Sequence, residues 1–142
     1  MVFGSGRCRA KAQRAQRGYN NAMIDVHEAA SRIQAANAQE REQLRLRRSE
    51  AQAFAREAAG RILALHPEAQ KVWGFGSTFE LWRNFRMTSD IDLAIESGDV
   101  VEIFPLVENR EYPVDLVCLQ DCPPTMGEFI RSQGTVLAET QT

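Results

Sequence analysis

Long apolar runs, a signal-like N-terminus and paired cysteines are all missing from this sequence. No segment approaches the roughly 18 consecutive apolar residues of a transmembrane helix, and the start lacks the apolar core of a secretory signal. The three cysteines, Cys8, Cys118 and Cys122, are an odd number, so we expect reduced thiols, buried or half-buried, and a cytoplasmic location. The sequence also lacks a P-loop and a complete dinucleotide fingerprint.

Acidic residues are absent from residues 1–22, which contain five basic side chains and almost no large apolar ones. This composition predicts a basic, disordered leader over residues 1–24. Residues 1–66 carry 12 Lys/Arg and 6 Asp/Glu, whereas residues 67–142 carry 5 and 13. The acidic second half argues against nucleic acid as a partner and is compatible with a site that attracts divalent cations.

Residues 25–66 are expected to form a long helical extension, because helix-favouring residues dominate and no proline occurs before Pro67. One apolar stripe follows helical spacing over its last part: Ala51, Phe54, Ala58, Ile62 and Leu65. We therefore expect residues 49–65 to pack on the domain. Arg47 and Arg48 interrupt the stripe, so the part before them is either a solvated helix, which we favour, or a helix that binds another chain or forms an oligomer.

Beyond Pro67, short apolar segments alternate with helical ones. The expected elements are strands at 71–75, 91–95 and 114–119, a helical turn at 78–83, helices at 100–108 and 124–132, and a last strand at 135–138. This alternation predicts a small sheet flanked by helices.

Two aspartates begin one of these strands. Asp90 and Asp92 are two residues apart and so point to the same face, while Ile91 and Leu93 point into the core. Asp115 lies in another apolar strand, which would bring it beside the pair if the two strands are neighbours. Carboxylate oxygens at this spacing suit Mg²⁺, and three carboxylates can hold two metal ions around a phosphate.

A glycine–serine pair, Gly76-Ser77, ends the preceding strand and is followed by Thr78. Glycine lets backbone N–H groups approach a phosphate, and the start of a helical turn adds partial positive charge. The Ser77 hydroxyl can donate to a phosphate oxygen. Three nearby aromatic residues could stack a base, although packing in the core is the favoured interpretation for each of them: Trp73, Trp82 and Phe85.

The order Gly76-Ser77, Ser89-Asp90-Ile-Asp92-Leu and Val114-Asp115-Leu-Val resembles the nucleotidyltransferase superfamily of DNA polymerase beta, and more closely its minimal nucleotidyltransferases (MNT). The resemblance covers about residues 67–139. It implies an α+β nucleotidyltransferase domain over residues 67–142, with a small mixed β-sheet flanked by helices and the long helix before it.

Site roles follow from the resemblance. It implies that Asp90 and Asp92 bind two Mg²⁺ ions, and that Asp115 assists one ion and activates the nucleophile. Gly76, Ser77 and Thr78 would contact the triphosphate of ATP. In place of the Arg-Gly that the family commonly has after the turn, this chain has Glu80-Leu81, so Arg83 or Arg86 is the candidate for the missing basic contact.

The same resemblance implies a function and a partner. Family members are antitoxins of HEPN-domain toxins, and some transfer AMP from ATP to a tyrosine of the toxin. We therefore expect a metal-dependent nucleotidyltransferase acting on a protein hydroxyl. Two alternatives remain open: an antitoxin that neutralises its partner by binding alone, and a nucleotidyltransferase acting on a small molecule such as an antibiotic.

Overall fold

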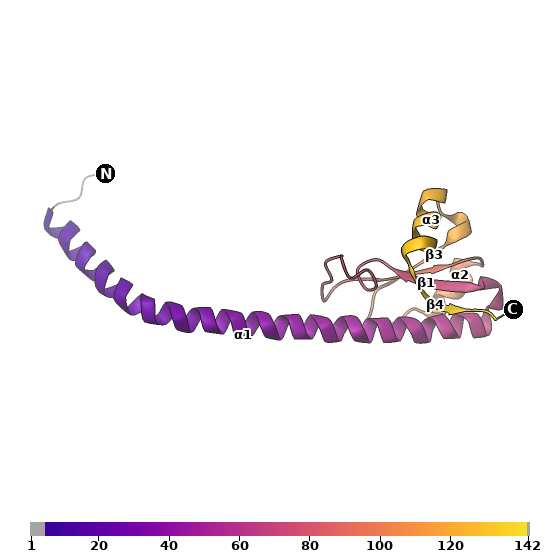
Figure 1. The fold of residues 1–142 in the computed structure, drawn as a ribbon, viewed down its shortest axis with the longest axis horizontal. Helices are drawn as coiled ribbons and strands as arrows, with labels where there is room; N and C mark the ends of the chain where they lie inside the picture. Colours follow the sequence, from indigo (N-terminus) through magenta and orange to yellow (C-terminus); the bar gives the residue numbers. More distant parts are fainter. Residues whose placement is uncertain (1–4, 142) are drawn as a thin grey trace. The chain divides into compact units, whose positions relative to one another are not determined.

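The computed structural model describes the backbone of residues 5–141 and the side chains of residues 25–141 (Figure 1). Its helices and strands are α1 (Ser5–Leu65), β1 (Lys71–Phe75), β2 (Ile91–Ile95), α2 (Val100–Ile103), β3 (Val114–Cys118), α3 (Pro124–Gln133) and β4 (Thr135–Glu139). Single 3₁₀ turns lie at Pro67–Ala69, Phe104–Leu106 and Leu119–Asp121. The predicted strands at 71–75 and 91–95 are confirmed to the residue.

Two expected helical segments differ from the prediction. The helix predicted over 100–108 is α-helical only to Ile103 and continues as the 3₁₀ turn Phe104–Leu106. Pro105 explains the change, because proline has no N–H to continue the α-helical hydrogen-bond ladder. Residues 78–83, predicted as a helical turn, form irregular turns instead.

Helix α1 is assigned from Ser5, although we expected a helix only from Asp25. The added residues are rich in Ala, Arg and Gln, and extending an existing helix costs far less than starting one. Residues 1–4 of the expected leader lie outside the described residues. Contacts divide the chain into two units, Met1–Glu42 and Gln43–Thr142. In the first unit, the described side chains, residues 25–42, are all exposed.

The second unit contains the sheet, whose strand order is β3-β2-β1-β4. Strand β1 pairs antiparallel with β2 and with β4, whereas β2 and β3 are parallel. The parallel pair is connected through α2, as parallel neighbours need a crossover between them. The predicted α+β class with a small mixed sheet and a long N-terminal helix is therefore confirmed.

The two faces of the sheet bury different cores (Figure 1). Alternate strand residues, including Val72, Ile91 and Leu93, pack with the last turns of α1 in the larger core. The opposite face, which carries Trp73 and Ala94, packs with Ile130 of α3. This alternation places odd and even residues of β2 in separate environments, as the pleat requires.

The apolar stripe of α1 is close to the predicted one. Ala51, Ala58 and Ile62 are buried and Phe54 is half-buried, but Leu65 is 63% exposed because the helix ends there. Ala55, which lies one turn before Ala59, is also buried, and both were missing from the prediction. Small alanines allow the helix backbone to lie close to the sheet.

The predicted burial of the cysteine thiols is confirmed where side chains are described. Cys118 is buried and Cys122 is half-buried, and both are free thiols. Cys8 lies outside the part of the chain whose side chains are described. Among the described residues, no helix combines the length and the apolar character needed to cross a bilayer.

Replacing Ile62 with alanine is expected to destabilise the second unit by about 2–5 kcal/mol, because the change leaves a cavity under the sheet. Leu65→Ala, on the exposed end of the same helix, is the matched control and should cost less than about 0.5 kcal/mol. Urea denaturation followed by circular dichroism measures both. Equal losses for the two variants would show that α1 does not pack on the sheet as described.

Candidate functional site

The turn after β1 is shaped around Gly76. This residue has a φ of +71°, and its carbonyl accepts hydrogen bonds from the N–H groups of Phe79 at 3.1 Å and Glu80 at 2.8 Å. A Cβ atom on residue 76 would overlap the Oδ2 atom of Asp92. Only glycine therefore satisfies both the backbone conformation and the space, which brings the turn directly against the Asp92 carboxylate.

Asp92 and Asp115 are register partners on the adjacent parallel strands β2 and β3. Neighbouring strands lie about 4.8 Å apart, so side chains at paired positions stand next to each other on one face. Asp92 is half-buried and Asp115 is exposed, while Asp90 is exposed just before β2 begins. The structure thus brings together the three predicted carboxylates at one end of the sheet.

The electrostatics of this end are those of a crowded anionic site. The pKa of Asp92 is raised to about 6, first because the carboxyl group is partly buried and next because of the negative charges of Asp115 and Asp90. Glu80 adds a smaller effect in the same direction, and the positive charge of Arg83 opposes it. Carboxylates that repel each other in this way favour a cation between them.

Thr78 occupies a different place from the one predicted. Its side chain is fully buried, and its hydroxyl donates to the carbonyl oxygen of Asp90 at 2.9 Å. Thr78 therefore fixes the turn to the residue that precedes β2, rather than facing a ligand. Ser77, next to it, is half-buried on the same turn.

Two residues of α1 that the motif did not include support the turn from behind. Arg48 donates to the carbonyl oxygens of Ser77, of Thr78 at 3.3 Å and of Glu80 at 2.9 Å. Gln52, one turn later, donates to the Thr78 carbonyl at 2.8 Å. The only sequence signal for this role was the interruption of the apolar stripe at Arg48.

The three aromatic residues near the site differ in their exposure to solvent. Trp73 and Phe85 are buried, as the favoured interpretation predicted. The same prediction was wrong for Trp82, which is 73% exposed and stacks against the guanidinium of Arg83, 4.7 Å from the ring centre. Arg83, predicted to contact the nucleotide, thus lies on the same loop and close enough to influence Asp92.

The carboxylates at this end of the sheet are potential ligands of a metal ion. Among residues 25–141, no group of three or more His, Cys, Asp or Glu side chains is already arranged around one point. The paired Asp92 and Asp115 nevertheless offer hard oxygen donors from adjacent strands. Mg²⁺ commonly takes one or two carboxylates and completes its shell with water and phosphate oxygens, so the residues fit that ion.

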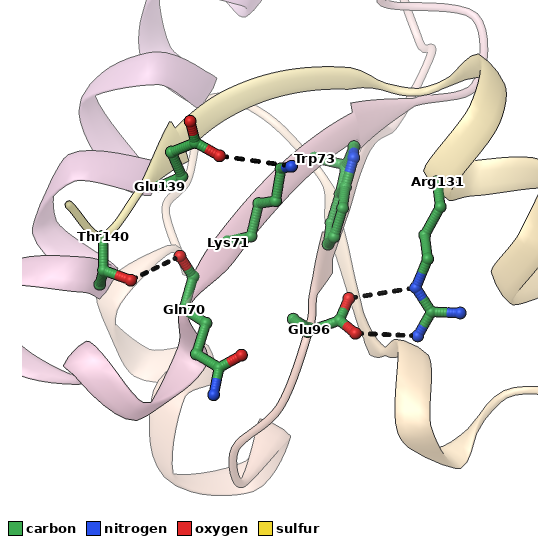
Figure 2. A pocket seen from close by; sticks show the side chains of 7 residues that line it. All are labelled: Gln70, Lys71, Trp73, Glu96, Arg131, Glu139 and Thr140. Atoms are coloured by element: carbon green, nitrogen blue, oxygen red, sulfur yellow. Dashed lines mark hydrogen bonds and ion pairs between the residues drawn. The ribbon is translucent and has the colours of Figure 1, made fainter. Parts of the chain in front are cut away.

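A pocket of about 370 Å³ lies at the opposite end of the strands (Figure 2). It is lined by Gln70, Lys71, Trp73, Glu96, Arg131, Glu139 and Thr140. Its four charged side chains form two ion pairs, Arg131 with Glu96 at 3.0 Å and Lys71 with Glu139 at 3.3 Å. Its charges are therefore matched within the protein, and it is separate from the carboxylate site.

Removing the Arg48 guanidinium should loosen the turn. Arg48→Met is expected to lower the free energy of unfolding by about 1–3 kcal/mol, because carbonyl oxygens of the turn lose a charged donor. Arg56→Met, at an exposed position of the same helix, should change it by less than about 0.5 kcal/mol. Urea denaturation gives the stabilities, and faster amide exchange confined to residues 77–86 would locate the effect.

The raised pKa of Asp92 makes stability depend on pH. The folded protein holds this proton more tightly than the unfolded chain, so the resulting stabilisation is present below about pH 4 and is lost as the pH rises through about 6. With a chelator present, Asp92→Asn should therefore raise the melting temperature by about 2–5 °C near pH 7.5 and hardly change it near pH 3.5.

Asp121→Asn, at an exposed aspartate outside the site, is the control for that titration and should move neither melting temperature. A direct measurement of the Asp92 carboxyl resonance by NMR should give a midpoint near 6. A midpoint near 4 would contradict the described partial burial of Asp92 and its proximity to Asp115 and Asp90.

Comparison with known proteins assigns no family: no protein-family model and no curated protein matches this chain. The carboxylates, the Gly76 turn and the loop after it are therefore the features from which a function can be proposed.

Proposed function

We propose that the second unit is a nucleotidyltransferase that binds Mg·ATP and transfers AMP to a protein hydroxyl, the tyrosine of a HEPN-domain toxin, and so acts as an antitoxin. One observation carries the proposal. Asp92 and Asp115 are register partners on adjacent parallel strands, and the Asp92 carboxylate lies directly against the Gly76 turn. Two carboxylate metal donors thus stand beside the Gly76-Ser77 turn.

Asp90, Asp92 and Asp115 would hold the magnesium ions. When bound, these ions supply charge neutralisation and Lewis-acid activation at the reacting phosphate. The raised pKa of Asp92 supports this assignment, because its partial burial and, next, the negative charges of Asp115 and Asp90 disfavour a carboxylate without a cation. A divalent cation would relieve that repulsion, so metal binding should also stabilise the fold.

The triphosphate would lie along the Gly76-Ser77 turn. The Ser77 hydroxyl, half-buried on this turn, can donate to a phosphate oxygen. Arg83 would add a positive charge from the loop, and a guanidinium can donate two parallel hydrogen bonds to a phosphate.

The reaction is an in-line displacement at the α-phosphorus of ATP. The acceptor hydroxyl oxygen forms a new bond to that phosphorus, and the bond to the oxygen bridging the α- and β-phosphates breaks. Pyrophosphate leaves with the electron pair of that bond. Asp115, the more exposed member of the strand pair, accepts the proton of the hydroxyl.

A protein acceptor is supported by the surface next to the carboxylates. Leu81, Trp82 and Met87 are 76%, 73% and 52% exposed, respectively, on one short loop. Exposed apolar residues gathered in this way are typical of surfaces that bind other proteins.

The test is transfer of label from ATP to the HEPN-domain protein expected from the adjacent gene. With Mg²⁺ present, label on the α-phosphate should appear on a tyrosine of that protein, whereas label on the γ-phosphate should not. Asp90→Asn combined with Asp92→Asn should reduce transfer by at least about 10³-fold, because the metal sites are removed. Chelating the metal should have the same effect on the unaltered protein.

The competing functions give other results in the same experiment. Neutralisation of the toxin without any transferred label, and unchanged in the double variant, would favour an antitoxin that acts by binding alone. Label transferred to an aminoglycoside but not to the protein would favour a small-molecule nucleotidyltransferase.

A further inference from the structure

The loop beside the carboxylates contains a buried charge that the proposed reaction does not use. The Glu80 side chain is only 5% exposed, and neither of its carboxylate oxygens has a hydrogen-bond partner among the described residues. A buried carboxylate is costly unless a charged or hydrogen-bonding group compensates it. The compensating contact in this structure is an ion pair, with Nε of Arg83 3.0 Å from Oε2 of Glu80.

Glu80 is itself fixed by its backbone. Its N–H donates to the Gly76 carbonyl at 2.8 Å, and its own carbonyl accepts from Arg48 at 2.9 Å. The carboxylate therefore projects from a well-anchored segment of the turn. A long, flexible side chain that pairs with it loses part of its freedom before any ligand arrives.

Arg83 is constrained on a second side by Trp82, whose ring centre lies 4.7 Å from the guanidinium carbon. The Arg83 side chain remains 45% exposed, and its positive charge acts on Asp92. The ion pair with Glu80 engages Nε and not the two Nη nitrogens. The Nη nitrogens of a guanidinium can form bidentate hydrogen bonds to a phosphate.

We infer that Glu80 is a positioning residue that orients Arg83, with Trp82 as a supporting platform, so that the guanidinium binds the β- and γ-phosphates of ATP beside the metal-binding carboxylates. This inference rests on the proposed function. It accounts for a buried acid and an exposed tryptophan that the three aspartates do not explain. It also accounts for an arginine that is ordered before a ligand arrives, which lowers the entropic cost of binding.

A metal-ligand role for Glu80 is the competing explanation. The direct ion pair with Arg83 argues against it. The two roles predict different measurements. A metal ligand changes the affinity for Mg²⁺ alone, whereas a positioning residue changes only the affinity for the nucleotide.

The experiment is a double-mutant cycle on the full chain, measured by isothermal titration with Mg·ATP and separately with Mg²⁺ alone. Arg83→Ala and Glu80→Gln should each weaken Mg·ATP binding about tenfold, the size expected for one charged hydrogen bond. The double variant should bind no more weakly than Arg83→Ala, because Glu80 acts through Arg83. The affinity for Mg²⁺ alone should stay unchanged in all three variants.

Two further variants keep the test independent of folding. Trp82→Ala, at an exposed position, should fold and should weaken Mg·ATP about two- to fivefold through loss of the stacking contact. Glu96→Gln removes a matched glutamate–arginine pair at the opposite end of the sheet, and should leave Mg·ATP binding unchanged.

The possible results separate the inference from the proposed function. Mg·ATP binding unchanged in Glu80→Gln and Trp82→Ala would overturn the inference while leaving the nucleotidyltransferase proposal intact. Additive losses in the double variant would also overturn it, since the two residues would then act independently. Weaker binding of Mg²⁺ alone in Glu80→Gln would identify a metal ligand instead. If the unaltered protein binds no Mg·ATP, the proposed function fails and this inference fails with it.

Discussion

The Asp92 carboxylate fills the space that a side chain on residue 76 would need, and the rest of the site depends on this contact. It requires glycine with a positive φ at the turn, and it fixes the position of the turn relative to β2. Since β2 and β3 are parallel and in register, the same constraint fixes where Asp115 stands. A one-residue slip of either strand would turn one carboxylate to the opposite face.

The turn is also constrained from the side of the long helix. Arg48 and Gln52 bind its carbonyl oxygens, while the buried Thr78 hydroxyl binds the backbone of Asp90. The last part of α1 is therefore more than an apolar cover for the sheet. It continues the buried stripe of alanines into polar contacts that orient the loop, which explains why the compact unit begins at Gln43, well before the strands.

Near the site, the aspartates lie at the ends of the strands, whereas the positively charged arginine lies on the loop. Partial burial, followed by the negative charges of Asp115 and Asp90, raises the pKa of Asp92 to about 6. Arg83 approaches from the loop, where Glu80 and Trp82 restrict it. A metal-bound polyphosphate has the complementary arrangement, with a cation that faces carboxylates and anionic oxygens that face a guanidinium. At the far end of the sheet, by contrast, the charges of the pocket are paired with one another.

Short-range patterns in the sequence determined the strands at 71–75 and 91–95 and the turn at Gly76, because alternation and glycine conformation act over a few residues. Only the tertiary structure decided which strands are neighbours, and hence that Asp115 joins Asp92. It also decided that Thr78 is buried, that Trp82 is exposed and that Arg48 supports the turn. Those outcomes depend on contacts between residues up to about 30 positions apart, which no local pattern of residues encodes.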